Sequence, residues 1–475
     1  DTLIGDFNAN VLRGGNGHDT LEGLLGADTL DGGDGNDTAS YEHAVAGVTV
    51  NLTDNSKNGG ADAVGDTLIS IENVTGSAFD DSLTGNTNAN TLRGGDGNDT
   101  LIGKGGADLL DGGGGNDTAS FAGSAIKVTA SLTTSFTDGD PVAQTGDAAG
   151  VVYTEIENLT GSDYDDTLIG DIGNNIINGG KGNNTLEGMG GADTFVGNVD
   201  TDTVTYNHAS AGVLASLTTT FTAGPAVIQT GDAAGDSFTS IENLTGSTYA
   251  DTLIGDSRDN VLRGGLGGDT LEGMGGADTL IGSVSGNDTA SYAHATSYVR
   301  ASLTTGLSGF VAEGHAGGDV YTSIENLTGS GFNDILIGDS GVNVIQSGAG
   351  DDVLEGMNGA DALDGGTGNN TASYEHATGV GGIGVTADLG NVANNLGDAA
   401  AGDTYTNIQN LAGSAYNDIL VGDAANNILS GGAGNDTLSG LGGTDTLYGG
   451  DGNDDLTDDG AGAAIMDGGA GDDTI

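Results

Sequence analysis

An aspartate or its amide recurs every nine residues between Gly76 and Ser120, each five residues after a glycine. The glycines stand at positions 76, 85, 94, 103 and 112, and Asp or Asn stands at 81, 90, 99, 108 and 117. A small or apolar residue follows two positions later, as Leu101 and Ala119 do. Calcium takes roughly six to eight oxygen ligands, which carboxylates and the carbonyls of glycine-rich turns can supply. The spacing therefore predicts a series of calcium sites.

Each nine-residue unit divides into a turn and a short strand. Gly94 to Asp99 is rich in glycine, and Thr100 to Ile102 can be extended, with Leu101 on the face opposite to its two neighbours. Because self-similarity at a fixed period indicates a repeat architecture, we expect coils of roughly eighteen residues with stacked leucines as a narrow core. Stacked carboxylates repel and glycine turns lose much entropy on ordering, so bound cations are needed to offset both costs.

The composition supports a metal-dependent scaffold. The chain has 475 residues, 93 glycines, no cysteine and a formal net charge of −60. About thirty divalent ions would cancel this charge, and one ion per near-complete turn gives on the order of twenty to thirty. The same charge argues against nucleic acid and anionic membrane as partners, and we expect disorder without calcium. No apolar run is long enough to span a membrane.

Six units carry the repeat most clearly: GGNGHDTLE from Gly14, GGDGNDTAS from Gly32, GGDGNDTLI from Gly94, GGGGNDTAS from Gly112, GGAGNDTLS from Gly431 and GGDGNDDLT from Gly449. They resemble the calcium-binding nonapeptide of the RTX, or haemolysin-type, family. The resemblance implies an all-β fold, a right-handed parallel β-roll (a β-solenoid) with calcium held between turns on the same side. It also implies that the motif aspartates and the carbonyls of the glycine region are the ligands.

The predicted metal ligands are therefore of two kinds, carboxylate and backbone. The aspartates are Asp19, Asp28, Asp37, Asp81, Asp99, Asp108, Asp117, Asp166, Asp193, Asp251, Asp269, Asp278, Asp334, Asp352, Asp361, Asp418, Asp436, Asp445, Asp454 and Asp473. The glycines of the six clearest units are Gly14, Gly15, Gly17, Gly32, Gly33, Gly35, Gly94, Gly95, Gly97, Gly112, Gly113, Gly115, Gly431, Gly432, Gly434, Gly449, Gly450 and Gly452.

A longer period lies on top of the short one. The phrase I-[EQ]-N-[VL]-[TA]-G-S begins at residues 71, 156, 241, 324 and 408, at spacings of 83 to 85 residues. We expect one continuous roll over 1–475 with super-repeats 1–80, 81–165, 166–250, 251–333, 334–417 and a partial 418–475. The second half of each super-repeat keeps strand-like alternation, so it should continue the same sheets around a variable loop. Because the sequence stops within a unit, we expect it to be part of a longer protein.

Other positions are ambiguous. Asn replaces the motif Asp at 90, 175, 184, 260, 343, 370 and 427, and an amide adds no charge, so calcium sites there should be weak. Asp147, Asp232 and Asp236 near the loop exits are either further ligands or ordinary turn residues. The Tyr-x-His sequence at 41, 206, 292 and 374 is either a transition-metal or pH-sensing ladder or, as we prefer, a structural stack, because its copies lie a super-repeat apart.

The sequence favours a structural function and no enzyme activity, because it lacks the short catalytic motifs and its paired acids are explained by the repeat. We expect an extracellular or cell-surface calcium-binding protein of a bacterium, such as an adhesin stalk, surface layer or matrix fibre, exported by type I secretion as the family usually is. Self-association end to end or side by side is a further hypothesis. The alternative is a folding and secretion module of a secreted enzyme or toxin, and a third option is carbohydrate binding through the variable loops.

Overall fold

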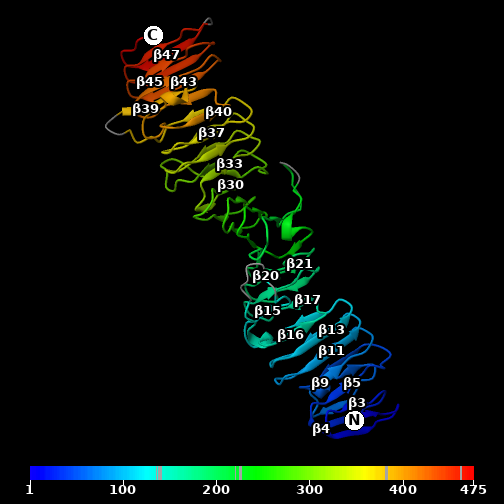
Figure 1. The fold of residues 1–475 in the computed structure, drawn as a ribbon. Coiled ribbons are helices and arrows are strands. Elements are labelled where there is room, and N and C mark those ends of the chain that lie inside the picture. The colour runs from blue at the N-terminus through cyan, green and yellow to red at the C-terminus, as the bar shows by residue number, and fades with distance from the viewer. Residues whose placement is uncertain (135, 137–141, 220, 224–226, 380–382, 461–462) are drawn as a thin grey trace. The chain divides into compact units, whose positions relative to one another are not determined.

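The computed structural model describes residues 1–475 except 135, 137–141, 220, 224–226, 380–382 and 461–462. Its chain contacts divide it into two compact units, residues 1–215 with 229–247 and residues 216–228 with 248–475. Within each unit short strands stack as parallel rungs (Figure 1). The described residues contain no helix long and apolar enough to cross a membrane. That residues 1–475 form one continuous roll stays a prediction.

The strand register gives the size of one coil. In the first unit Leu83 of β10 (Ser82–Thr84) pairs with Leu101 of β12 (Thr100–Ile102), and Leu101 pairs with Ala119 of β14 (Thr118–Ser120). Each partner is eighteen residues further along the chain, so a coil holds two nonapeptides, as the sequence predicts. These three side chains are fully buried, and so are Leu92 and Leu110, which pair in a second sheet, so the core is built from small and medium apolar residues of both sheets.

Four groups of strands make up the first unit. The first is β1 (Thr2–Ile4), β3 (Thr20–Glu22), β5 (Thr38–Ser40), β9 (Asn73–Thr75), β11 (Thr91–Asp96), β13 (Leu109–Gly114) and β16 (Val152–Thr154); the second is β2 (Val11–Gly17), β4 (Thr29–Gly35) and β8 (Thr67–Ile69). The third is β7 (Gly59–Gly60), β6 (Val48–Asn51), β10, β12, β14, β17 (Asn158–Thr160), β19 (Ile176–Asn178), β21 (Thr194–Val196) and β24 (Ser237–Thr239); the fourth is β15 (Thr129–Ser131), β18 (Thr167–Ile169), β20 (Thr185–Glu187), β22 (Thr203–Thr205) and β25 (Asn243–Thr245).

The second unit repeats this arrangement. Its groups are β27 (Val261–Arg263), β29 (Thr279–Ile281) and β32 (Val320–Thr322); β26 (Thr252–Ile254), β28 (Thr270–Glu272), β30 (Thr289–Ser291), β33 (Asn326–Thr328), β35 (Val344–Gln346), β37 (Ala362–Asp364) and β40 (Thr404–Thr406); β31 (Arg300–Ser302), β34 (Ile335–Ile337), β36 (Val353–Glu355), β38 (Thr371–Ser373), β41 (Asn410–Ala412), β43 (Ile428–Ala433), β45 (Thr446–Asp451) and β47 (Ile465–Ala470); and β39 (Ile383–Asp388), β42 (Asn417–Val421), β44 (Thr437–Ser439) and β46 (Asp455–Thr457). The boundary between the units falls within β23 (Leu214–Ser216).

The second half of each super-repeat continues the sheets, as expected, but changes the register. Thr38 of β5 pairs with Asn73 of β9, so the step between these strands is 35 residues instead of eighteen. The intervening loop carries a short 3-10 helix, η1 (Asn55–Lys57), with its counterpart η6 (Val392–Asn394) in the fifth super-repeat. In the other three loops a 3-10 helix lies nearer the loop exit: η2 (Gly146–Ala148), η3 (Gly231–Ala233) and η4 (Gly314–Ala316). The parallel pairing in both units confirms the all-β, parallel β-roll fold.

Candidate metal centre

A ladder of hydrogen bonds fixes the motif aspartates. The backbone N–H of Asp81 donates to Oδ1 of Asp99 at 2.7 Å, and the N–H of Asp99 donates to Oδ1 of Asp117 at 2.7 Å. In the second unit the N–H of Asp436 donates to Oδ1 of Asp454 at 2.8 Å. Each bond joins equivalent turns one coil apart, so the eighteen-residue register itself sets the orientation of these carboxylates.

The second oxygen of most motif aspartates has no hydrogen-bond donor. In fifteen of them Oδ2 is buried and no described residue donates to it: Asp19, Asp28, Asp37, Asp99, Asp108, Asp117, Asp193, Asp202, Asp269, Asp278, Asp352, Asp361, Asp436, Asp445 and Asp454. Burying a charged oxygen without a partner is costly. A bound cation at Oδ2 would remove this cost.

The space beside Oδ2 is lined by further oxygens. A Cβ atom placed on Gly94 would overlap Oδ2 of Asp99 and would lie 2.6 Å from the carbonyl oxygen of Gly112 in the next coil. The first glycine of the motif thus keeps open a space that a carboxylate and a carbonyl flank from adjacent turns. No group of three or more Asp, Glu or His side chains within the described part of the chain is placed to hold an ion. Each site would therefore combine carboxylates with backbone carbonyls, the hard donor set that calcium prefers.

Burial without a counter-ion shifts the acidity of these carboxyls. Burial raises the pKa of Asp99 to about 7, with smaller contributions from the charges of Asp81 and Asp117 and an opposing one from its hydrogen bond. Burial likewise raises the pKa of Asp193, Asp278 and Asp361 to about 7. A cation at Oδ2 would stabilise the ionised form and lower these values.

The asparagine positions show what replaces a cation. Nδ2 of Asn90 donates to the carbonyl of Glu72 at 2.7 Å, and Nδ2 of Asn343 donates to the carbonyl of Glu325 at 2.7 Å. Nδ2 of Asn370 donates to the carbonyls of Gly365 at 2.7 Å and Asn407 at 3.0 Å. At these positions an amide N–H₂ reaches the carbonyls directly, so the turn is satisfied without an ion. This geometry gives a second reason, besides the missing charge, to predict weak calcium binding there.

Four predicted ligands form a second class with both oxygens already hydrogen-bonded. In Asp166, Oδ2 accepts from the N–H of Ser162 at 2.5 Å, and Oδ1 accepts from Oγ of Ser162 at 2.9 Å and from the N–H of Val128 at 2.6 Å. The other three members, in the same G-S-x-x-x-D context, are Asp81, Asp334 and Asp418. The geometry makes these four aspartates anchors for the backbone, in contrast to the fifteen with an unpaired Oδ2.

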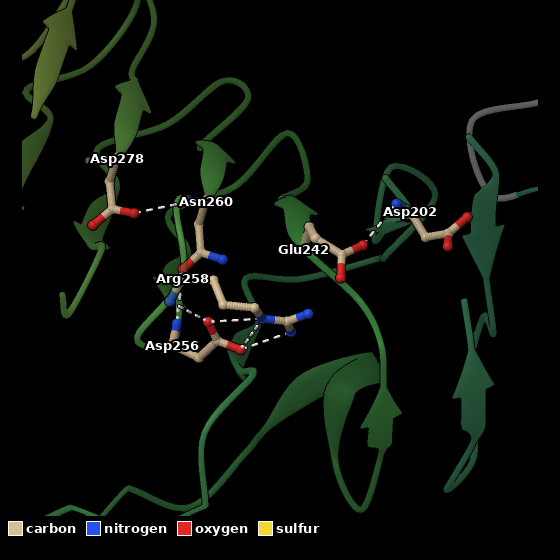
Figure 2. A network of polar contacts seen from close by, with 6 residues as sticks. All are labelled: Asp202, Glu242, Asp256, Arg258, Asn260 and Asp278. Carbon is tan, nitrogen blue, oxygen red and sulfur yellow. Dashed lines mark hydrogen bonds and ion pairs between the residues drawn. The ribbon is translucent and has the colours of Figure 1, made fainter. Parts of the chain in front are cut away.

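The sequence-based list missed two kinds of residue. Asp202 belongs to the set with an unpaired Oδ2, and its spacing of five residues from Gly197 could have revealed it. Its N–H donates to Oε2 of Glu242 at 3.0 Å, so a glutamate of the I-E-N phrase takes the place of the next motif Asp (Figure 2). Glu72, Glu157 and Glu325 accept in the same way.

The same figure shows the ladder in the second unit. There the N–H of Asn260 donates to Oδ1 of Asp278 at 2.8 Å (Figure 2). Arg258 lies beside the half-buried Asp256, with its Nη2 2.7 Å from Oδ2 of Asp256. The arginine therefore engages a carboxylate outside the set of buried motif aspartates.

The Tyr-x-His sequence proves to be two separate hydrogen-bonded pairs. The buried Tyr374 hydroxyl donates to Oδ2 of Asp403 at 2.9 Å, and Nδ1 of His376 lies 2.7 Å from Oε2 of Glu355. Tyr41 and His43 make the corresponding contacts with Asp66 and Glu22.

The second super-repeat lacks all four side chains together. Phe121 and Val151 stand at the Tyr and Asp positions, and Gly123 and Ile102 stand at the His and Glu positions. Because both partners of each pair change at once, the pairs are structural units, which supports the structural interpretation over a transition-metal ladder.

Comparison with known proteins agrees with this geometry. The family model described as the RTX calcium-binding nonapeptide repeat (4 copies) matches residues 4–39, 70–101, 84–119, 154–186, 169–204, 245–280, 322–345, 337–372, 407–438 and 421–456. Together these matches cover more than half of the chain. No curated protein matches the sequence.

Proposed function

Because the chain belongs to the RTX calcium-binding nonapeptide repeat family, we propose that it is an extracellular structural protein whose β-roll is held together by calcium. The unpaired, buried Oδ2 atoms carry this proposal. They recur in both units at the position where the family's repeat has its aspartate. Roughly one divalent ion for each of these fifteen turns would neutralise about half of the −60 charge.

The proposed role is to provide length and stiffness at the cell surface or in a matrix, as in an adhesin stalk, a surface layer or a fibre. The super-repeat supports this role, because near-identical segments of 83 to 85 residues recur with the same strands, ladder and loop position. The motif carboxylates are used by the scaffold itself, through Oδ1 as hydrogen-bond acceptors and through Oδ2 as cation ligands. We propose no catalytic role for them.

A calcium titration tests the extracellular role. Sites that work outside the cell bind in roughly the 0.1 to 1 mM range, whereas cytosolic buffers bind far more tightly. We expect the coil-to-β transition, followed by circular dichroism, to have its midpoint near millimolar free calcium. A midpoint below micromolar calcium would contradict an extracellular role while leaving calcium binding intact.

Light scattering on the same samples separates the structural alternatives. A folded chain that stays monomeric at high protein concentration and millimolar calcium is a spacer, or a folding and secretion module attached to another domain. Growth in mass that begins with the folding transition is the behaviour of a fibre or lattice component. Constant mass over the whole titration would contradict self-assembly.

A further inference from the structure

One loop covers a motif turn in each complete super-repeat, and in the first super-repeat it is the segment 61–66. The N–H of Asp28 donates to Oδ1 of Asp66 at 2.9 Å, and the N–H of Thr67 donates to the carbonyl of Asp28 at 2.7 Å. Gly65 approaches Ala27 so closely that a Cβ on the glycine would lie 3.0 Å from the alanine Cβ. The loop, which has no nonapeptide sequence, thus sits where the next motif turn would be.

Two buried carboxylates near this junction, Asp66 and Glu22, are fully engaged. Asp66 accepts from the Asp28 N–H through Oδ1 and from the Tyr41 hydroxyl, at 3.1 Å, through Oδ2. Both oxygens of Glu22 lie 3.0 Å from Nδ1 of His43. These two side chains have their partners within the protein.

Two more carboxylates, Asp28 and Asp62, each keep one buried oxygen without a donor. These atoms are Oδ2 of Asp28 and Oδ1 of Asp62, and the residues are 1% and 5% exposed. Asp62 lies four residues before Asp66, whose Oδ1 accepts from the backbone of Asp28, so the loop brings Asp62 to the same junction as Asp28. An unpaired acidic oxygen on Asp62 is independent of the repeat, because Asp62 belongs to no nonapeptide.

We propose that Asp28 and Asp62 hold a divalent cation of the hard, oxygen-binding class, with calcium as the expected ion, between the motif turn and the loop. Backbone carbonyls and water would complete its coordination. The inference rests on the proposed calcium-binding function and extends it to a loop outside the family repeat. The ion joins a loop to the roll where the eighteen-residue register breaks, so the series of sites continues across the insertion.

The residue at the position of Asp62 differs between super-repeats. Asp232 occupies the Asp62 position in the third super-repeat, beside Asp193 with its unpaired Oδ2. In the second unit His315 occupies it, with a buried Nδ1 that also has no partner among the described residues, beside Asp278. The chain thus offers one repeat where the second carboxylate is replaced by a neutral ligand.

The test counts bound calcium ions on the whole chain by native mass spectrometry, with folding checked by circular dichroism. Asp62→Asn and, independently, Asp232→Asn should each lose one ion at a calcium concentration that saturates the unmodified chain. Asp54→Asn is the matched control, because Asp54 is an exposed carboxylate of the same loop region that already accepts from Ser56. His315→Asp should gain one ion.

Unchanged ion counts in folded Asp62→Asn and Asp232→Asn would overturn the proposal and leave the turn sites unaffected. An unmodified chain that binds no calcium at all would instead overturn the proposed function. A failure of His315→Asp to gain an ion would show that Asp278 and this position do not form a site, contrary to the proposal.

Discussion

The N–H of Asp99 donates to Oδ1 of Asp117 at 2.7 Å, while Oδ2 of Asp117 is buried and accepts no hydrogen bond from the described residues. One carboxylate thus has two functions. Oδ1 satisfies the backbone of the preceding coil, and Oδ2 faces a space that the glycine of the same turn keeps open. The hydrogen bond aligns the coils, and the second oxygen is the proposed cation ligand.

Replacing Asp117 by Asn should remove one calcium site without removing the hydrogen bond to Asp99, because the amide keeps Oδ1. At free calcium about 100-fold above the dissociation constant, one site contributes about 2.7 kcal/mol to the free energy of unfolding. We therefore expect one ion fewer by native mass spectrometry and a loss of stability of this order in calcium-saturated urea unfolding.

Two control variants make the Asp117 prediction specific. Asp96→Asn removes the same charge from an exposed position in a neighbouring turn. It should change neither the number of bound ions nor the free energy of unfolding. Asp166→Asn should weaken the fold but keep the ion count, because both oxygens of Asp166 already accept protein hydrogen bonds. Loss of an ion in Asp166→Asn would contradict the division of the aspartates into two classes.

Asn370→Asp should create a calcium site. Nδ2 of Asn370 now donates to the carbonyls of Gly365 and Asn407, and a carboxylate oxygen there would face both carbonyls without a donor. The unmodified Asp117 turn already has this arrangement. We expect one additional ion in the mass spectrum at saturating calcium. We also expect folding of the variant to depend more strongly on calcium, because the new carboxylate has no donor without an ion. An unchanged ion count would show that the amide does not mark the metal position.

Gly94→Ala should disrupt the site of Asp99, because the new Cβ would overlap Oδ2 and lie 2.6 Å from the carbonyl of Gly112. Gly190→Ala is the matched control, since a Cβ at Gly190 meets nothing within 4 Å. In saturating calcium the melting temperature of Gly94→Ala should be clearly lower than that of the unmodified chain. Equal melting temperatures for the two variants would contradict the packing of Gly94 against the cation ligands.

The calcium-free chain should gain structure as the pH falls. Folded pKa values of about 7 for Asp99, Asp193, Asp278 and Asp361 lie above the ordinary value of 3.8, so the folded state binds more protons between these limits. The resulting stability is complete below about pH 4 and is lost as the pH rises through 7. Circular dichroism of metal-stripped protein at pH 4.5 and pH 8 checks this. Equal spectra, or more β structure at pH 8, would contradict the pKa assignment.

Local periodicity predicts the fold well because the coil is built from local pairings. Glycine, aspartate and leucine, as at Gly94, Asp99 and Leu101, each recur at a step of nine residues. This recurrence is enough to indicate strands, turns and the eighteen-residue coil, and the structure has them in register. The pairing of Thr38 with Asn73 is harder to predict, because the loop between them has no period and its length varies.

The site is less predictable, because its chemistry depends on neighbours outside the motif. Asp99 and Asp166 have similar local sequences, but Ser162, four residues before Asp166, supplies donors to both its oxygens. The role of Glu242 depends on a contact with Asp202, forty residues earlier. Neither distinction follows from the spacing of the motif alone.

Whether calcium holds the β-roll together can be measured by far-ultraviolet circular dichroism of the whole chain at pH 7.5, first in chelator and then with calcium added. We expect a disordered spectrum in chelator and a cooperative change to β structure with calcium, reversed by renewed chelation. Full β structure already present in chelator, unchanged by calcium, would show that the unpaired aspartate oxygens need no ion and that calcium does not hold this fold together.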